Sequence, residues 1–321
     1  MKKITLIGAG AYSLALSRIL DKNGVDVTIF TMIADEKELL DRERKNNRIL
    51  PDAGILEHTA ISDNPEDAFS DDCLVIIALP SDVVRPVISS LARYLNGKII
   101  CLTTKGVEAE TGLLMHDVVN SILEGHKLCA ISGPSIALEI ANYLPTIVTA
   151  AGNHECTSFL KDCFENSKFK VEQTDDLAGT LACGSFKNIY AIGAGILSAK
   201  GAGSNALASL ITRANIEMSD IVEAVGGRRE TMSLSCGIGD LVTTCTSTLS
   251  RNRRFGVLVG EEGLADATVN IKSTTVEGYT ALIGAMRMVH EHQLSLPVAE
   301  AINSIARDNQ SPGILLEAIC K

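Results

Sequence analysis

The 321-residue chain contains no tryptophan, and aromatic residues make up only 4% of it. Proteins that bind single-stranded nucleic acids stack bases on aromatic side chains, and binding to phosphate backbones or anionic membranes requires excess positive charge. This chain has 29 basic and 39 acidic residues, which gives a net charge of −10. Its composition therefore argues against nucleic-acid and anionic membrane partners, whereas a small anionic ligand could still bind where positive charge is concentrated.

Long apolar runs are also missing, because no stretch approaches the roughly 18 uncharged apolar residues that a membrane span requires. The basic start Met1–Lys3 is followed by apolar residues as in a signal peptide, but Arg18 and Asp21 interrupt that pattern. Nine cysteines are scattered without a CxxC pair or Cys/His metal spacing, and His290 and His292 would face opposite sides of a helix. We expect a cytoplasmic protein with free thiols, no membrane insertion and no bound metal.

The first half of the chain alternates between strand and helix patterns. Its content of 46% hydrophobic and 21% charged residues is typical of globular proteins, and its length corresponds to about two domains. Apolar, β-branched runs predict strands at residues 3–8, 25–30, 73–79, 98–102, 127–131, 146–150 and 168–173, and helical spacing predicts helices at 11–22, 35–45, 82–94, 110–123 and 154–164. This alternation predicts an α/β Rossmann-like domain with a mostly parallel sheet.

After about residue 178 the strand patterns stop, and helical runs rich in small residues follow. These runs cover residues 186–199, 204–225, 275–290 and 298–305. We therefore predict a Rossmann-like domain at residues 1–180 and an all-α domain at residues 181–321.

A glycine-rich turn joins the first predicted strand to the first predicted helix. Gly8 and Gly10 leave the backbone free of side chains there, so that a pyrophosphate could approach the N–H groups at the start of the helix. Ser13 stands where a full dinucleotide fingerprint has its third glycine, and glycines in such a turn can also be purely structural. The further βα units favour a dinucleotide cofactor. The end of the second strand, Phe30–Met32, shows neither the acidic residue typical of NAD nor the arginine typical of NADP, so the preference is left open.

Loops at the carboxyl ends of the strands are where doubly wound sheets bind their ligands. Lys105 lies in one such loop and could reach an anion or an oxygenated substrate, although a solvated loop lysine is the alternative. Ser132–Ser135 lies in another, where an ordinary helix start is the alternative. Both loops are candidate ligand sites.

Polar residues interrupt the helical half in two places. Lys187–Asn188 lies within a strongly apolar run, where a lysine must face the surface or have a partner. Asp240 and Thr244 would lie one turn apart on one face of a helix. The pair Arg251–Asn252 suits bidentate binding of a small phosphate. The next two arginines, Arg253 and Arg254, are equally compatible with charged residues on the surface. A nearby Asp240 favours the charged form of a lysine and burial favours the neutral form, so the direction of a pKa shift is left open.

Seven motifs occur in the order seen in bacterial-type NAD(P)-dependent glycerol-3-phosphate dehydrogenases, and the chain resembles this family from residue 4 to about residue 300. The motifs are Gly8–Gly10, Thr104–Gly106, Ser132–Glu139, Lys187–Asn188, Gly239–Cys245, Ser250–Gly256 and Val276–Gly278. The resemblance implies hydride transfer between NAD or NADP and C2 of a small phosphorylated substrate, dihydroxyacetone phosphate or sn-glycerol 3-phosphate. It implies that the product supplies phospholipid synthesis. The oligomeric state is left open, with a homodimer as a candidate.

The resemblance also implies roles for individual residues. Lys187 matches the proton donor and acceptor, Lys105 matches a lysine that assists at the substrate, and Asp240 completes the catalytic set. The implied substrate-binding residues are Lys105, Gly133, Ser135, Lys187, Asn188, Asp240, Thr244, Ser250, Arg251 and Asn252, of which Arg251 and Asn252 hold the phosphate. The implied cofactor-binding residues are Gly8, Gly10, Ala11, Tyr12, Lys105, Ala137, Arg251 and Glu277. An ammonium suits this chemistry, because reduction of a ketone builds negative charge on its oxygen.

Several positions depart from the family pattern. Ser13 replaces a glycine, Ala11 replaces a common serine, Leu234 replaces a glycine, and Ala199–Lys200 replaces an aspartate. These changes leave two alternatives open, a related dehydrogenase for another small phosphorylated polyol or ketone, and a non-catalytic sensor that binds a nucleotide. The charged and hydroxylated residues that catalysis requires are nevertheless all present.

Overall fold

The computed structural model describes residues 2–69, 73–264, 267 and 276–321, and the chain forms two compact units. The first unit comprises Met1–Thr104 and Met115–Leu177, and the second comprises Lys105–Leu114 and Ala178–Lys321. The short segment Lys105–Leu114 thus groups with the helical unit, although the chain on both sides of it belongs to the first. The predicted boundary at residue 180 placed this segment in the first domain.

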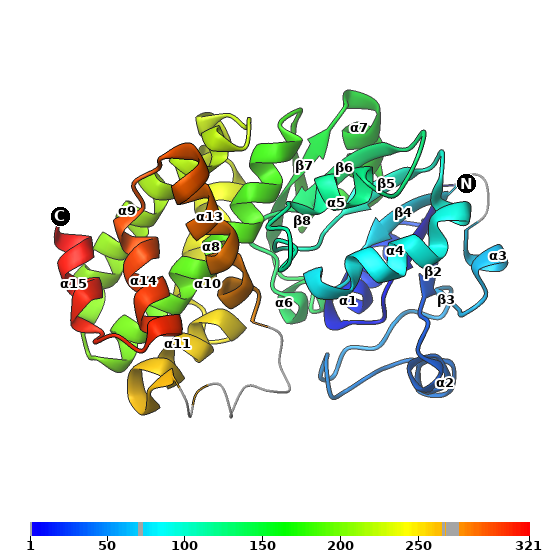
Figure 1. The fold of residues 1–321 in the computed structure, drawn as a ribbon. Coiled ribbons are helices and arrows are strands. Elements are labelled where there is room, and N and C mark those ends of the chain that lie inside the picture. Colours follow the sequence, from blue (N-terminus) through cyan, green and yellow to red (C-terminus); the bar gives the residue numbers. More distant parts are fainter. Residues whose placement is uncertain (1, 70–72, 265–266, 268–275) are drawn as a thin grey trace. The chain divides into compact units, whose positions relative to one another are not determined.

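The first unit is built on an eight-stranded sheet with the strand order β3-β2-β1-β4-β5-β6-β7-β8 in the described residues (Figure 1). The strands are β1 Lys3–Ile7, β2 Asp26–Phe30, β3 Ala60–Ser62, β4 Cys73–Ile77, β5 Ile99–Leu102, β6 Lys127–Ser132, β7 Thr146–Gly152 and β8 Phe169–Thr174. All neighbouring pairs are parallel except β6 and β7. The predicted α/β class with a mostly parallel sheet is confirmed. The sequence did not predict β3, because three residues are too few to show a period.

Helices cover both faces of this sheet (Figure 1). They are α1 Ala11–Lys22, α2 Ala34–Glu43, α3 Pro65–Ala68, α4 Ser81–Leu95, α5 Met115–Asn120, α6 Ala137–Ala141 and α7 His154–Phe164. α1 packs with α6 and α7, whereas α4 packs with α3 and α5. Right-handed crossovers place these two groups on opposite faces, because the strand order reverses at β1. The carboxyl end of β1, which leads into the glycine turn, therefore lies at the switch point where such sheets bind ligands.

The helix predicted at residues 110–123 is wrong over its first part. α5 begins only at Met115, and before it Val107 and Leu114 form an isolated antiparallel bridge. Gly112 has a φ of +73° in this segment, a left-handed conformation that an α-helix does not contain. The glycine therefore produces a turn where apolar spacing alone suggested a helix.

Helices make up most of the second unit, as predicted. The elements are α8 Leu177–Ala199, α9 Gly203–Ala224, a 3₁₀ turn η1 Arg229–Ser233, a π-type turn η2 Ser235–Gly239, α10 Asp240–Thr246, α11 Arg251–Glu262, α13 Glu277–His292, α14 Pro297–Asp308 and α15 Gly313–Cys320. The runs predicted at 186–199, 204–225 and 298–305 correspond to α8, α9 and α14. The run at 275–290 corresponds to α13, except that residue 275 lies outside the described residues. α11 and α15 were not predicted.

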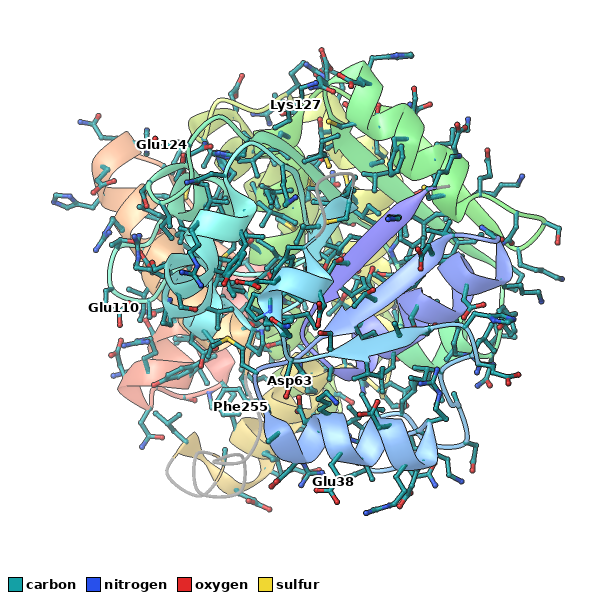
Figure 2. The ribbon with its side chains drawn as sticks, turned by 90° about the vertical axis from the view of Figure 1, so that its right-hand side faces the viewer. Glu38, Asp63, Glu110, Glu124, Lys127 and Phe255 are labelled. Carbon is teal, nitrogen blue, oxygen red and sulfur yellow. The ribbon has the colours of Figure 1, made fainter. Side chains whose placement is uncertain are left out.

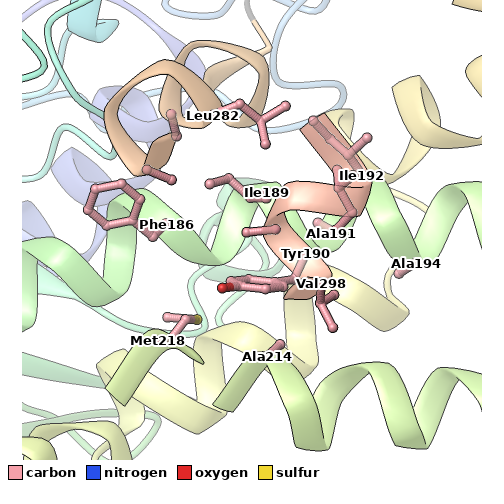
Figure 3. Packing of buried hydrophobic residues seen from close by; sticks show 14 of the residues in the cluster. Phe186, Ile189, Tyr190, Ala191, Ile192, Ala194, Ala214, Met218, Leu282 and Val298 are labelled. Atoms are coloured by element: carbon pink, nitrogen blue, oxygen red, sulfur yellow. The ribbon is translucent and has the colours of Figure 1, made fainter. Parts of the chain in front are cut away.

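α8 forms the centre of the core of the second unit. Its residues Gly179–Leu197 are all buried. Figure 3 shows how Phe186, Ile189 and Tyr190 of this helix pack among side chains of α9, α13 and α14, including Met218, Leu282 and Val298. A polar side chain on α8 is consequently surrounded by protein and needs a partner there.

Two glycines allow α11 to lie directly on α8. A Cβ atom at Gly195 of α8 would come within 2.0 Å of the Arg253 carbonyl oxygen, and a Cβ atom at Gly256 of α11 would come within 2.0 Å of the Ile192 carbonyl oxygen. No side chain fits at either position, so this pair of glycines sets the close approach of the two helices. The start of α11 is thereby held beside α8.

None of the nine cysteines forms a disulfide, and eight of them are buried, whereas Cys320 is exposed. Among the described helices, none is both long enough and apolar enough to cross a membrane.

Candidate active site

Lys187 is buried in the middle of α8, and its ammonium group has two side-chain partners on α10. Its Nζ donates to Oδ1 of Asp240 at 2.5 Å and to Oγ1 of Thr244 at 2.6 Å. The side chain of Lys187 is 5% exposed and that of Asp240 is 2% exposed. The two partners lie one turn apart on α10, so both face α8. The lysine that stood out in an apolar run is therefore fully enclosed and partnered.

Lys105 brings a second ammonium group to the same carboxylate. Its Nζ donates to Oδ2 of Asp240 at 2.8 Å, while Oδ1 accepts from Lys187. The Lys105 side chain is 22% exposed, so it is the more accessible of the two lysines. One buried carboxylate thus binds two ammonium groups, and the cluster carries a net charge of +1 when both lysines are protonated.

Burial and charge oppose each other at this cluster. Burial lowers the pKa of Lys187 to about 8, against the attraction of Asp240 and with help from the positive charge of Lys105. Burial alone would raise the pKa of the Asp240 carboxyl, but the charges and hydrogen bonds of the two lysines hold this pKa below its ordinary value. Asp240 is therefore ionised at neutral pH, and Lys187 can release and accept a proton at a pH close to neutral.

Two buried asparagines, Asn188 and Asn252, both contact the start of α13. Asn188 follows Lys187 on α8 and is 4% exposed. The Oδ1 atom of Asn252 on α11 accepts a hydrogen bond from the Gly278 N–H at 2.9 Å. A Cβ atom at Gly278 would come within 2.4 Å of the Asn188 carbonyl oxygen, so the start of α13 packs tightly on α8. Gly278 thus contacts the backbone of Asn188 and the side-chain amide of Asn252.

The first turn of α11 carries the arginine cluster. Ser250 is the N-cap residue, and its hydroxyl accepts a hydrogen bond from the Arg253 N–H at 3.2 Å. Arg251 and Arg254 are exposed, whereas Arg253 is half-buried and its guanidinium donates to the Ser198 hydroxyl at 3.2 Å. Arg251 is thus an available cation next to the buried Asn252. Arg253 instead ties α11 to the end of α8.

Glu277, another predicted residue, is the first residue of α13 and is half-buried. It directly precedes Gly278, the glycine that contacts Asn188 and Asn252. Glu277 is therefore placed at the edge of the same region of the second unit.

In the first unit, the turn after β1 presents its backbone. Gly8 has a φ of +107°, and a Cβ atom there would lie 2.9 Å from the Ala78 carbonyl oxygen, so only glycine fits. Gly10 is the N-cap residue of α1, where a Cβ atom would meet nothing within 4 Å and no side chain caps the helix. Ala11 begins the helix. The uncapped N–H groups and the partial positive charge of this helix end fit the pyrophosphate of a dinucleotide.

A second loop of the first unit is joined to this turn. The hydroxyl of Tyr12 on α1 donates to Oγ of Ser135 at 3.2 Å, and the Ser135 hydroxyl donates to the Gly133 carbonyl at 2.9 Å. Gly133 has a φ of +146°, and a Cβ atom there would lie 3.0 Å from Cα of Val148. Ala137 begins α6 immediately afterwards, so the helix starts two residues later than Ser135. The structure thus brings together the predicted residues of the β1 and β6 loops.

The sequence missed one buried group close to the cluster. Ser185 on α8 hydrogen-bonds to the backbone of Gly106, the residue after Lys105. Gly106 has a φ of +151° and Gly112 a φ of +73°. The presence of these two glycines within seven residues was the sequence signal that predicts a turn and not a helix.

No group of His, Cys, Asp and Glu in the described part of the chain could hold a metal ion.

Two family models match this chain. The model described as "NAD-dependent glycerol-3-phosphate dehydrogenase N-terminus" matches residues 3–158, and the one described as "NAD-dependent glycerol-3-phosphate dehydrogenase C-terminus" matches residues 176–317. The glycerol-3-phosphate dehydrogenase (NAD(P)+) of Fusobacterium nucleatum is 33% identical over 315 residues, which cover 97% of this chain and 94% of that protein. That of Halorhodospira halophila is 34% identical over 301 residues, which cover 93% of this chain and 90% of that protein. A crystal structure of glycerol-3-phosphate dehydrogenase from Coxiella burnetii superposes with a TM-score of 0.92 at 31% identity, covering 100% of this chain and 99% of that one.

Proposed function

Because the chain belongs to the NAD-dependent glycerol-3-phosphate dehydrogenase family, we propose that it interconverts sn-glycerol 3-phosphate and dihydroxyacetone phosphate with NAD(H) or NADP(H). The single observation that carries this proposal is the Lys187 ammonium, buried and hydrogen-bonded to Asp240 and Thr244. A group of this kind can supply and take back the proton that a ketone and an alcohol exchange. The bound cofactor supplies or accepts the hydride.

In the direction of ketone reduction, protonated Lys187 polarises the carbonyl oxygen and then donates its proton to it. The Lys105 ammonium adds a second positive charge where negative charge develops on that oxygen. In the direction of oxidation, neutral Lys187 accepts the hydroxyl proton. A Lys187 pKa of about 8 supports both roles, because both protonation states are populated near neutral pH. Asp240 stays ionised and holds the two ammonium groups in place.

The remaining predicted residues take binding roles in this proposal. Arg251 and Asn252 bind the substrate phosphate through charge-assisted and amide hydrogen bonds. The other proposed substrate contacts are Gly133, Ser135, Asn188, Thr244 and Ser250, and the other proposed cofactor contacts are Gly8, Gly10, Ala11, Tyr12, Ala137 and Glu277, with Lys105 and Arg251 serving both ligands. The uncapped start of α1 supports the pyrophosphate site.

For the cofactor we propose that NADH is preferred over NADPH. In dinucleotide-binding folds the adenosine ribose lies at the end of the second strand. Here the Thr31 hydroxyl donates to the Glu36 carboxylate at 2.8 Å, and Asp35 and Glu36 both lie in the first turn of α2. Figure 2 shows two further acidic side chains, Glu38 on α2 and Asp63 after β3, of which Glu38 forms an ion pair with Arg42 at 3.6 Å. The carboxylates of Asp35 and Glu36 would repel the 2′-phosphate of NADPH.

The experiment that tests the function is the oxidation of NADH and NADPH, followed by absorbance, with dihydroxyacetone phosphate and with a panel of other phosphorylated ketones. Rapid turnover of dihydroxyacetone phosphate, faster with NADH, is the expected result. Turnover of another phosphoketone alone would favour the related dehydrogenase that the changes at Ala199–Lys200 and Leu234 suggest. Cofactor binding without turnover of any ketone would favour the sensor.

We further propose a cytoplasmic location, a role in supplying glycerol 3-phosphate for phospholipid synthesis, and a homodimeric assembly. The exposed side chain of Ile216 on α9 lines a pocket together with Ile211, Met232 and Ile238, and this apolar surface supports association with a second copy. Sedimentation velocity distinguishes a dimer from a monomer.

A further inference from the structure

Lys105 reaches the catalytic cluster from a segment with its own anchors. Val107 and Leu114 form an isolated bridge, and both side chains are buried in the core of the second unit. Both anchors follow Gly106 in the sequence, whereas Lys105 precedes it. Because Gly106 has a φ of +151°, the backbone between Lys105 and Val107 takes a path that other residues rarely adopt. On the other side of Lys105, the Thr104 hydroxyl donates to the Leu79 carbonyl at 2.8 Å. Gly106 therefore lies between two anchored stretches, and a contact at this glycine sets the direction in which Lys105 leaves the segment.

Ser185 provides this contact from α8. Its Oγ atom accepts a hydrogen bond from the Gly106 N–H at 3.0 Å. The same atom lies 2.9 Å from the Gly106 carbonyl oxygen and 2.8 Å from the Leu181 carbonyl oxygen, so its single proton is shared between these two acceptors. The side chain is 1% exposed. The hydroxyl therefore satisfies a buried backbone N–H, which would otherwise lose its partner.

The clamp between Ser185 and Gly106 lies directly beside both lysines in the sequence. Ser185 precedes Lys187 by two residues on α8, and Lys105 directly precedes Gly106. We propose that Ser185 is a positioning residue for the proposed reaction, which holds the Lys105 backbone against α8 so that both ammonium groups stay on the carboxylate of Asp240. The catalytic part of this inference rests on the proposed function, whereas the clamp itself does not.

Loss of the clamp should change the protonation of Lys187. The titratable groups that face Lys187 are Asp240 and Cys245 on α10 and Lys105 on the loop segment. The positive charge of Lys105 helps to lower the pKa of Lys187. If Lys105 moves away from Asp240, this repulsion weakens and Asp240 is left to pair with Lys187 alone. Both changes favour protonated Lys187, so its pKa rises.

The test is the Ser185→Ala variant of the full chain. We expect kcat for dihydroxyacetone phosphate reduction to fall about tenfold. The midpoint of the pH profile for glycerol 3-phosphate oxidation should move to higher pH. Ser185→Cys has a side chain of similar volume whose sulfur accepts a hydrogen bond more weakly than the hydroxyl does. It should therefore lower kcat and shift the pH profile in the same direction, but by less.

Ser219→Ala is the matched control. Ser219 is a buried serine on α9 whose hydroxyl donates to the Asn215 carbonyl at 2.7 Å, four residues earlier in its own helix. The Ser219→Ala substitution removes a hydrogen bond within a helix, like the one between Ser185 and Leu181. Among the described residues, Ser219 makes no hydrogen bond with Lys105, Lys187 or Asp240. The control should keep the original pH profile. An equal shift in both variants would overturn the inference, because it would show a general loss of helix stability.

Two further measurements do not require turnover. Hydrogen exchange at the Gly106 amide and the rate at which acetic anhydride modifies Lys105, followed by mass spectrometry, should both increase in Ser185→Ala and not in Ser219→Ala. If the original chain fails to reduce dihydroxyacetone phosphate, the proposed function fails, and these two rates still decide whether the clamp exists. Unchanged rates in folded Ser185→Ala, or faster rates with an unchanged pH profile in an active enzyme, would contradict the positioning role.

Discussion

The first unit offers backbone groups to its proposed ligand, whereas the second unit offers charged side chains. At Gly8 and Gly10 the absence of side chains exposes the N–H groups at the start of α1. In the second unit the reactive groups are Lys187, Lys105 and Asp240, which are held together by the ion pairs of both lysines with the buried carboxylate. A backbone site depends on local conformation, and a side-chain cluster depends on how distant elements pack. Substitutions in the glycine turn should therefore change cofactor binding, whereas those in the lysine cluster should change the chemical step.

The largest effect is expected at Lys187. Lys187→Ala removes the proton donor, so kcat should fall by about 10²-fold or more, while the Kd for NADH changes little because the proposed cofactor contacts are elsewhere. Steady-state kinetics and NADH fluorescence titration measure the two quantities. Lys168→Ala, which removes an exposed lysine just before β8, is the control and should leave both unchanged. A retained kcat in Lys187→Ala would make this lysine purely structural.

The next largest effect is expected at Arg251. Arg251→Ala removes a charge-assisted hydrogen bond to the phosphate, worth about 1.5–3 kcal/mol, so KM for dihydroxyacetone phosphate should rise by about 10- to 100-fold. Arg254→Ala, on the same helix and also exposed, should leave KM within about twofold if its charge is remote from the substrate. Equal effects of the two variants would show that only the overall positive charge of this helix end matters.

The contrast between the units also explains what the sequence could predict. The βα turn at Gly8 and Gly10 was found from local pattern, because a strand, a glycine turn and a helix follow one another in the chain. Lys187, Asp240 and Thr244 were found as candidates, but the hydrogen bonds among them link α8 to α10 and depend on packing. The direction of the Lys187 pKa shift could not be predicted, because it depends on the degree of burial.

The segment that carries Lys105 shows the limit of periodicity. Apolar spacing suggested a helix from residue 110, yet Gly112 adopts a left-handed conformation and the residues before Met115 join the second unit. The contact of Ser185 with Gly106 spans 79 positions, so no local pattern could reveal it. The short strand β3 and the antiparallel pairing of β6 with β7 were also not predicted, because both depend on which strands lie side by side in the sheet.

A pair of glycine variants tests the first unit. Gly10→Ala should leave the free energy of unfolding within about 1 kcal/mol, because the added Cβ meets no neighbour, but it should weaken NADH binding by about tenfold if the pyrophosphate approaches this backbone. Gly8→Ala should instead lower the free energy of unfolding by about 1–3 kcal/mol, because of its positive φ and the close Ala78 carbonyl. Urea denaturation and NADH titration measure the two effects. Tight NADH binding by Gly10→Ala would place the cofactor elsewhere.

The smallest effect concerns pH and compares the units directly. With a Lys187 pKa of about 8, the neutral fraction rises from about one tenth at pH 7 to about one half at pH 8. Glycerol 3-phosphate oxidation, which requires neutral lysine, should therefore accelerate about fivefold over this interval, and ketone reduction should slow as pH rises above 8. The Kd for NADH should stay constant over the same interval, because backbone N–H groups do not titrate there. An oxidation rate that is flat in pH, or that follows the NADH Kd, would show that Lys187 does not exchange the proton.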